Sequence, residues 1–247
     1  MTPLPPNEEV LEIRGLVKSY NGRRVVDRVD MTLNRSEIVG LLGPNGAGKT
    51  TTFYMTIGFI QPDGGAVFLN GEDITEYPMY LRARRGINYL PQEPSVFRKL
   101  TVEGNLLAIL ESLPIPEHEI QDQLKRLLSE LKIGHLAKQR ASSLSGGERR
   151  RLEITRALVT EPRFMLLDEP FAGIDPLALN DIKQIILQLK KRGIGIFISD
   201  HNVRETLKVC DSAYIINQGR IIEFGAPEKI VRSPIARNVY LGDNFDL

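Results

Sequence analysis

The feature that most constrains the fold is the octapeptide GPNGAGKT at residues 43–50, which follows the apolar run IVGLL and precedes an apolar helical segment. A glycine-rich loop between a buried strand and a helix can aim backbone N–H groups at phosphate oxygens, and the helix adds the positive end of its dipole. The segment matches the phosphate-binding pattern G-x-x-x-x-G-K-[ST] in full. Chance produces that pattern in only about one chain in a hundred, so an ordinary glycine-rich turn is the weaker interpretation.

This loop predicts a nucleoside phosphate bound with Mg²⁺. We expect Lys49 to reach the β- and γ-phosphates and Thr50 to offer its hydroxyl to the metal. The other residues expected to contact the nucleotide here are Gly43, Pro44, Asn45, Gly46, Ala47, Gly48 and Thr51.

A magnesium–phosphate site also needs a carboxylate, and the segment FMLLDE at residues 164–169 supplies it at the end of an apolar strand. Asp168 is expected to hold the water shell of Mg²⁺, which usually takes few protein ligands. Glu169 is expected to polarise an attacking water. The alternative is an acidic strand end before a turn made by Pro170, and the phosphate loop makes that alternative less favourable.

A second helix start, LSGGERRRLEI at residues 144–154, contains two glycines that each cost about 1 kcal/mol relative to alanine. Ser145 and Glu148 have the spacing of a capping box, which predicts that the helix begins here. Gly146 and Gly147 then leave first-turn N–H groups open to a phosphate. Because this helix start has no lysine and no metal ligand, we expect it to contact a nucleotide that another element already holds.

The rest of the chain predicts a single α/β domain over residues 10–247, after a flexible leader at 1–9. Apolar runs alternate with helical patterns, as in a mainly parallel sheet with crossover helices. Residues 10–33 instead predict an antiparallel pair of strands joined by the turn Asn21-Gly22. We expect a core at about 10–92 and 155–225, an inserted helical subdomain at about 93–154, and a C-terminal extension at about 226–247.

Composition narrows the functional classes. Lys and Arg total 32 against 31 Asp and Glu, so the chain lacks the basic excess of nucleic-acid-binding proteins, and no such partner is expected. The single cysteine, Cys210, suits a reducing cytoplasm, where we expect a small buried residue. No run of about 20 apolar residues is present to span a bilayer.

Together, GPNGAGKT, LSGGE and LLDEP resemble the ATPase subunits of ABC transporters, in which LSGGE is the signature motif. The resemblance covers almost the whole chain and implies a P-loop NTPase fold of the ABC ATPase type, with a RecA-like core. It also implies a head-to-tail homodimer, in which ATP on one copy's phosphate loop is covered by the signature helix of the other. The expected nucleotide contacts on that helix are Ser145, Gly146 and Gly147.

Further roles follow from the same resemblance. Tyr20 is at the position that stacks on adenine, although it could be an ordinary tyrosine at a strand end. Gln92 is at the position that senses Mg²⁺ and the attacking water, and His201 at that of the switch histidine near the γ-phosphate. Asp175 is at the position of the loop aspartate that crosses the dimer interface. Ala172 replaces the serine of many relatives, which weakens the expected hydrogen bonds of that loop.

Within the family, the stretches ARRGINYLPQEPSVFRKL, SDHNVRETL and VYLGDNF resemble the ATPase of bacterial lipopolysaccharide export. This implies two integral membrane permease subunits docking near Gln92, Phe97 and Arg98, on the cytoplasmic face of the inner membrane. Core packing is the alternative for Phe97. The alternative functions are the ATPase of a branched-chain amino-acid importer and a soluble ABC ATPase. Relatives of that soluble type typically carry two ATPase domains or a long coiled-coil insertion, which this chain lacks.

Overall fold

The computed structural model describes residues 9–242 and 245–246, and within this part the strands form two sheets. The smaller sheet is antiparallel, with the order β2-β1-β4-β5. Its strands are β1 (Val10–Tyr20), β2 (Arg23–Asn34), β4 (Gly64–Leu69) and β5 (Glu72–Asp73). Both residues of the Asn21-Gly22 turn have positive φ, 50° and 77°, which the tight hairpin between β1 and β2 requires.

The larger sheet has the order β10-β9-β3-β8-β7-β6. Its strands run parallel from β9 to β6, and only the edge strand β10 is antiparallel. They are β3 (Ile38–Leu42), β6 (Ile87–Leu90), β7 (Phe164–Asp168), β8 (Gly195–Ser199), β9 (Ser212–Asn217) and β10 (Arg220–Gly225). Every residue of β3, β7 and β8 is buried, as expected for parallel strands covered on both faces.

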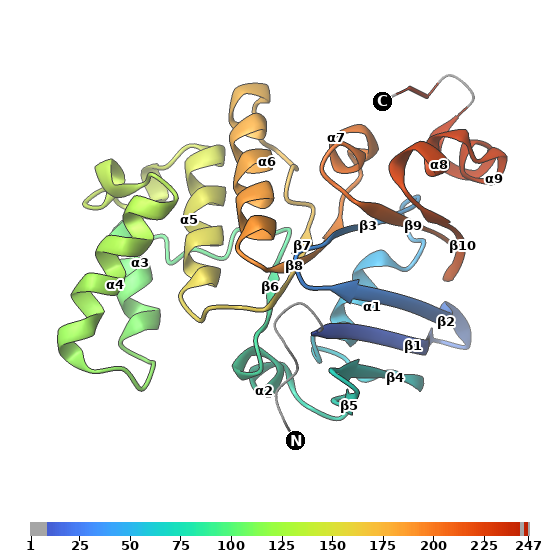
Figure 1. Cartoon of the computed structure of the whole chain (residues 1–247), viewed down its shortest axis with the longest axis horizontal. Helices are drawn as coiled ribbons and strands as arrows, with labels where there is room; N and C mark the ends of the chain where they lie inside the picture. Colours follow the sequence, from blue (N-terminus) through green and yellow to red (C-terminus); the bar gives the residue numbers. More distant parts are fainter. Residues whose placement is uncertain (1–8, 243–244, 247) are drawn as a thin grey trace.

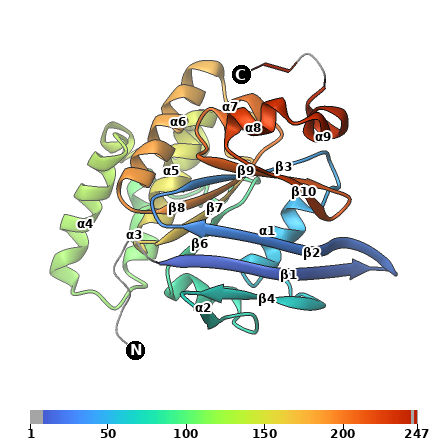
Figure 2. The same ribbon diagram turned by 45° about the vertical axis from the view of Figure 1, so that its right-hand side comes forward.

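Helices surround this sheet unevenly (Figures 1 and 2). The phosphate loop leads into α1, while α3, α4 and α5 lie together at one side of the molecule, beyond α6 in Figure 1. The helices are α1 (Lys49–Thr56), α2 (Met79–Arg84), α3 (Val102–Leu110), α4 (Glu117–Glu130), α5 (Gly146–Leu158), α6 (Pro176–Lys191), α7 (Val203–Leu207), α8 (Pro227–Arg232) and α9 (Pro234–Ala236). Short 3₁₀ turns at Gly134–Leu136 and Ala141–Ser143 and a π-helical turn at Arg237–Leu241 complete the list.

The predicted fold class is confirmed: an α/β P-loop architecture with an N-terminal antiparallel sheet and helices inserted between β6 and β7. The predicted leader ends at Glu9, the first residue that the structure describes. Glu9 is buried, and its carboxylate pairs with Arg35 at 2.7 Å and with Arg163. The rest of the leader lies outside the described residues. The boundaries of the core, the helical subdomain and the C-terminal extension stay predictions.

In the described part of the chain, no helix has the length and apolarity needed to cross a bilayer.

A buried arginine connects the phosphate-loop helix to the next helix of the core. Arg82, in α2, is 0 % exposed and donates hydrogen bonds to the carbonyls of Met55 and Thr56 at the end of α1, both at 2.8 Å. It also donates to the carbonyls of Thr75 and Tyr77. Burial lowers the pKa of Arg82 to about 10, so the guanidinium remains charged at neutral pH. Arg82 therefore satisfies the last carbonyls of α1, which a helix leaves without partners.

Replacing Arg82 with Met should lower the free energy of unfolding by roughly 3–5 kcal/mol, because four hydrogen bonds to backbone carbonyls are lost, three of them buried. Urea denaturation measures this loss. Arg84, on the exposed side of the same helix, is the matched control, and Arg84→Met should change stability by less than about 0.5 kcal/mol. Equal effects of the two substitutions would contradict this role for Arg82.

Candidate nucleotide-binding site

The predicted site residues gather where four neighbouring parallel strands end. In the order β3-β8-β7-β6, the carboxyl ends lead into the phosphate loop, His201, Glu169 and Gln92. Parallel strands present these ends along one edge of the sheet, which is where open α/β sheets bind ligands. The fold thus brings together segments that are far apart in the sequence.

The phosphate loop has the backbone that its glycines allow. Gly48 has φ of 110°, and a Cβ there would lie 2.6 Å from the carbonyl oxygen of Val25, so a larger residue is excluded. The Lys49 ammonium is buried and donates to the carbonyls of Gly43 at 2.7 Å and Pro44 at 3.1 Å. The backbone of the phosphate loop therefore surrounds the positive charge of Lys49.

Acidic groups surround that charge. Burial lowers the pKa of Lys49, and the nearby carboxylates of Glu169, Asp168 and Asp200 oppose the shift. Asp168 is 3 % exposed and accepts a hydrogen bond from the hydroxyl of Tyr89 at 3.0 Å. Burial raises the pKa of Asp168, and neighbouring Glu169 adds to the effect. Burial and neighbouring charges therefore shift the pKa values of several groups in this site, as is common at catalytic sites.

The carboxylate of Glu169, which follows β7, contacts side chains that follow the neighbouring strands β6 and β8. Its oxygen accepts a hydrogen bond from the Gln92 amide at 2.7 Å, and His201 Nδ1 lies 3.2 Å from the same oxygen. Glu169 has φ of 47°, a left-handed conformation that non-glycine residues adopt mainly under functional or structural constraint. Its N–H donates to the carbonyl of Ser199 at 2.6 Å, which fixes this conformation against the end of β8.

Sequence reasoning missed Asp200, which is 0 % exposed at the end of β8. Its carboxylate accepts from the N–H groups of Phe171 at 2.9 Å and Asn202 at 2.7 Å, joining the loop after β7 to the loop after β8. Burial raises the pKa of Asp200. The available signal was an acidic residue directly after a buried strand, the same signal that identified Asp168.

The second helix start forms as predicted. Ser145 caps α5: its hydroxyl accepts from the N–H of Glu148 at 3.3 Å, and the Glu148 carboxylate accepts from the N–H of Ser145 at 2.8 Å. These hydrogen bonds lower the pKa of Glu148. Ser145 and Gly146 are exposed, so this part of the helix start is open to a ligand.

Gly147 also has a packing role that the sequence did not indicate. It is buried, and a Cβ there would lie 2.5 Å from the Cβ of Ala178 in α6. The second glycine therefore lets the starts of α5 and α6 pack closely, whatever it also does for a phosphate. This contact joins residues 31 positions apart, which no helical pattern reveals.

Two other predicted residues lie apart from the strand ends. Tyr20 ends β1 and is 46 % exposed, and the Lys18 ammonium lies 5.8 Å from the centroid of its ring. Asp175 caps α6 and accepts from the N–H groups of Leu177 and Ala178 at 3.1 and 3.0 Å. Figures 1 and 2 place α5 beside α6 and away from α1, so one chain does not bring its signature helix to its own phosphate loop.

A buried ion pair, also missed from the sequence, connects α5 to this edge of the sheet. Arg150 donates to the Glu153 carboxylate at 3.0 Å, to the carbonyl of Pro91 at 2.9 Å and to that of Asp168 at 3.1 Å. Glu153 in turn accepts from the N–H of Ser95 at 2.9 Å. The helix that begins with the signature thus holds both the segment after Gln92 and the end of β7.

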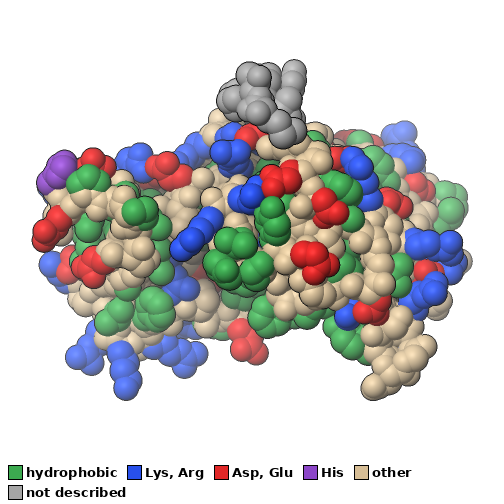
Figure 3. Space-filling model, turned by 90° about the horizontal axis from the view of Figure 1, so that it is seen from below, with side chains coloured by type: hydrophobic (Ala, Val, Ile, Leu, Met, Phe, Trp, Pro, Cys, Tyr) green, Lys and Arg blue, Asp and Glu red, His purple; other side chains and the backbone are tan. Residues whose placement is uncertain are grey.

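The segment after Gln92 leads to an exposed apolar area. Phe97 is 44 % exposed, and its neighbour Arg98 is also exposed. The Phe97 ring lies 4.8 Å from the Arg156 guanidinium, and Arg156 lines a groove together with Met79 and Ala83 of α2 and Ile109 of α3. Figure 3, which shows the molecule from below, has hydrophobic side chains near the middle of the face that it presents, with Lys, Arg, Asp and Glu side chains around them.

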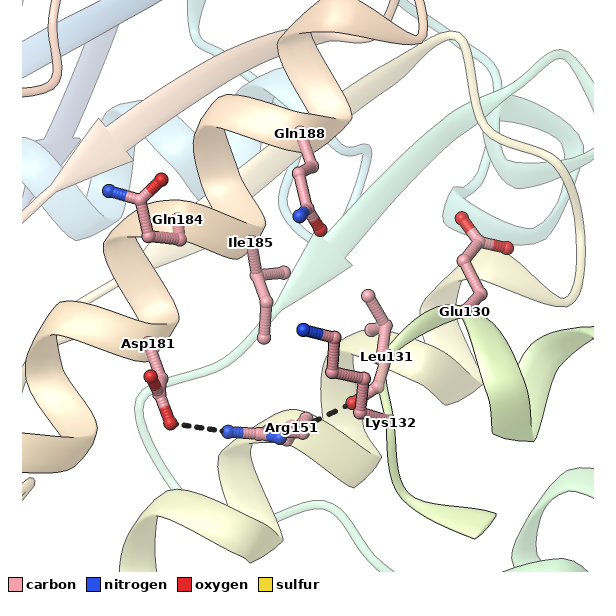
Figure 4. Close-up of a pocket in the computed structure, with 8 residues that line it drawn as sticks. All are labelled: Glu130, Leu131, Lys132, Arg151, Asp181, Gln184, Ile185 and Gln188. Atoms are coloured by element: carbon pink, nitrogen blue, oxygen red, sulfur yellow. Dashed lines mark hydrogen bonds and ion pairs between the residues drawn. The ribbon is translucent and has the colours of Figure 1, made fainter.

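A more polar hollow lies between α4, α5 and α6, outside the strand-end site (Figure 4). Arg151 points across it to the Asp181 carboxylate at 2.7 Å, with Gln184 and Gln188 along the α6 side. Because an ion pair within the fold occupies this hollow, we assign it to helix packing.

The donors at the strand ends suit Mg²⁺ held together with phosphates. Among the described residues, no group of three or more His, Cys, Asp and Glu side chains could hold a metal ion unaided. The candidates are instead the Thr50 hydroxyl, the Asp168 carboxylate and the Gln92 amide, all oxygen donors of the kind that Mg²⁺ prefers. These few protein ligands fit an ion whose other ligands are water molecules and phosphate oxygens.

Comparison with known proteins identifies the family. The ABC transporter family matches residues 26–172. The chain belongs to this family.

Two relatives are each named "lipopolysaccharide export system ATP-binding protein LptB". The one from Acidithiobacillus ferridurans is 54% identical over 239 residues, covering 97% of this chain and 99% of its own length. The one from Escherichia coli K12 is 52% identical, covering 96% and 99%. A nucleotide-free ATP-binding cassette from an ABC transporter has a TM-score of 0.86 at 31% identity, covering 95% of this chain and 100% of its own.

The buried Asp168 carboxylate should reduce stability at neutral pH. Its pKa is raised in the folded chain, so folding favours the protonated form, and the cost is lost as the pH falls through the raised pKa. Asp168→Asn should therefore increase the unfolding free energy at pH 7, on the order of 1 kcal/mol, and the gain should shrink toward pH 4.

Thermal unfolding measured across this pH range tests the expectation. The control Asp122→Asn removes a carboxylate whose side chain is 83% exposed in α4 and should have little effect at either pH. A gain for Asp168→Asn that did not vary with pH would count against burial as its cause.

Proposed function

We propose that this chain hydrolyses ATP to power lipopolysaccharide extraction from the inner membrane toward the outer membrane. The family is that of ABC transporters, and the relatives named for lipopolysaccharide export align over nearly their whole length. One structural observation carries the catalytic part of the proposal. The Glu169 carboxylate lies within hydrogen-bonding reach of both Gln92 and His201, beside a phosphate loop and a buried aspartate.

In the proposed mechanism, the phosphate loop holds the β- and γ-phosphates while Glu169 orients a water in line with the γ-phosphate. The Gln92 amide, already bonded to Glu169, keeps that carboxylate directed at the water. The Lys49 ammonium and the His201 ring stabilise the charge that develops on the phosphoryl oxygens. Mg²⁺, held by Thr50 and Asp168 with Gln92 nearby, would neutralise phosphate charge when bound. Tyr20 stacks on the adenine.

A second copy of the chain completes the site. The exposed start of α5, at Ser145 and Gly146, offers N–H groups to an anion but lies away from the phosphate loop of its own chain. A head-to-tail homodimer brings each α5 start to the γ-phosphate held by the other copy. Asp175, which caps the adjacent α6, then lies at the interface between the copies.

Membrane coupling is assigned to the surface around Phe97. We place the chain on the cytoplasmic face of the inner membrane, bound to two integral membrane permease subunits near Gln92, Phe97 and Arg98. The exposed Phe97 side chain and the partly apolar groove lined by its neighbour Arg156 support this placement, since exposed apolar patches commonly mark binding sites. Closure of the ATP-bound dimer moves this surface, and hydrolysis then releases it.

Glu169→Gln should leave ATP binding intact while lowering the turnover number by about 10²–10⁴, because an amide cannot act as the base. Phosphate release measures turnover, and size-exclusion chromatography with ATP should show the dimer held closed. Glu161→Gln, at an exposed site in the preceding loop, is the control and should turn over normally. Normal turnover by Glu169→Gln would remove Glu169 from this role.

Ser145→Arg should abolish most hydrolysis while leaving ATP affinity of the isolated subunit unchanged, because the α5 start contacts the nucleotide of the other copy. The new side chain blocks the anion-binding N–H groups, and the lost cap should cost only about 1 kcal/mol of stability. Equilibrium binding of a fluorescent ATP analogue to monomer, compared with turnover by dimer, separates the effects. Loss of monomer binding would show that the signature helix acts within its own chain.

A further inference from the structure

The exposed docking residues stand on a backbone that one buried amide holds in place. Asn105, in α3, is 0 % exposed. Its Oδ1 accepts from the N–H of Phe97 at 2.8 Å, and its Nδ2 donates to the carbonyl of Phe97 at 3.1 Å. A further bond from Nδ2 reaches the carbonyl of Thr101 at 2.9 Å. Both backbone polar groups of the exposed phenylalanine are thus bound by a single side chain.

A buried amide at position 105 is unfavourable for stability unless its hydrogen bonds serve a purpose. Its neighbours Val102 and Leu106 are fully buried apolar residues, and a leucine would suit both the core and the helix better. A buried amide costs free energy unless its hydrogen bonds are made, and here they are made to a single loop. The side chain therefore fixes where residues 97–101 lie.

The same loop is connected to both parts of the proposed catalytic machinery. Five residues before Phe97, in the segment that leads into the loop, Gln92 bonds to Glu169. Farther along, the carbonyl of Arg98 accepts from the N–H of Ser142 at 3.1 Å, and that of Leu100 from the N–H of Ala141 at 2.9 Å. These partners lie just before the cap of α5 at Ser145. The Phe97 ring also lies 4.8 Å from the Arg156 guanidinium, farther along α5.

We propose that Asn105 is a positioning residue for coupling: it holds Phe97 and Arg98 in the orientation that the membrane subunits bind, and it takes no part in ATP chemistry. This inference rests on the proposed docking at Phe97. Because residues 92–101 are bonded to Glu169 through Gln92 and to the segment before Ser145 through Arg98 and Leu100, a force on Phe97 reaches both parts of the proposed catalytic machinery. Loosening the loop at Asn105 uncouples them from the membrane subunits.

The first test measures the loop itself. Asn105→Leu has a similar volume and removes all three hydrogen bonds, and Asn105→Ala serves where the leucine variant folds poorly. Native-state hydrogen exchange should show the Phe97 amide exchanging about tenfold faster or more, relative to amides in the middle of α3. The control Leu110→Ala removes a buried side chain from the end of α3 and should leave that ratio unchanged. An unchanged ratio in the Asn105 variants would overturn the inference.

The second test measures docking. The wild-type subunit is isolated from membranes with its two membrane subunits, and each variant is exchanged into that purified pair. Asn105→Leu should weaken binding by about tenfold while leaving ATP affinity of the isolated subunit unchanged. Combined with Phe97→Ala, it should add little further loss, since both changes remove the same contact. A merely structural role would instead give additive losses and would overturn the inference.

The remaining outcomes separate this inference from the proposed function. If Phe97→Ala loses binding but Asn105→Leu does not, the docking site stands and the positioning role is overturned. If Phe97→Ala itself binds the membrane subunits normally, docking at Phe97 fails, and the inference fails with it.

Discussion

The parallel alignment of β3, β8, β7 and β6 is the constraint on which the site depends. Parallel strands have their carboxyl ends at the same edge of the sheet, so the fold alone brings four loops together there, before any ligand binds. This arrangement costs free energy, because it buries charged groups close to one another. Asp168 and Asp200 are desolvated there with raised pKa values, and the Lys49 ammonium lies among them with a lowered one. The sheet thus holds together charged groups that would not gather by themselves, at the edge where the nucleotide is proposed to bind.

The helix α5 joins this edge to two other surfaces. Its exposed start lies away from the phosphate loop of its own chain, and its buried Arg150 and Glu153 hold the segment around Gln92 and the end of β7. Gly147 adds close packing against α6. One rigid helix therefore connects the surface proposed to meet a second copy, the catalytic edge and the loop that carries Phe97. This arrangement gives the proposed coupling a physical route through packed, hydrogen-bonded groups.

Local sequence patterns predicted much of the fold and part of the site. The phosphate loop, the strand before Asp168 and the cap at Ser145 are formed by residues close together in the chain, and the structure has the loop, strand and helix at those positions. The pairing of β1 with β2 followed from one turn. The hydrogen bond that joins Asp200 to Phe171 spans 29 residues, and those that join Arg150 to Pro91 and Glu153 to Ser95 span 59 and 58, so local patterns did not reveal these contacts. The close approach of Gly147 to Ala178 was missed for the same reason.

By itself, the sequence determined the kinds of chemistry available: a loop that binds phosphate, carboxylates at strand ends, and a second helix start open to an anion. Each depends on spacing within a short segment, where backbone geometry leaves few alternatives. Only the tertiary structure decided that Gln92 and His201 both face Glu169, that Asn105 holds Phe97, and that α5 lies away from α1. These arrangements depend on which strands become neighbours and which helices pack together, and that choice is made by the whole core.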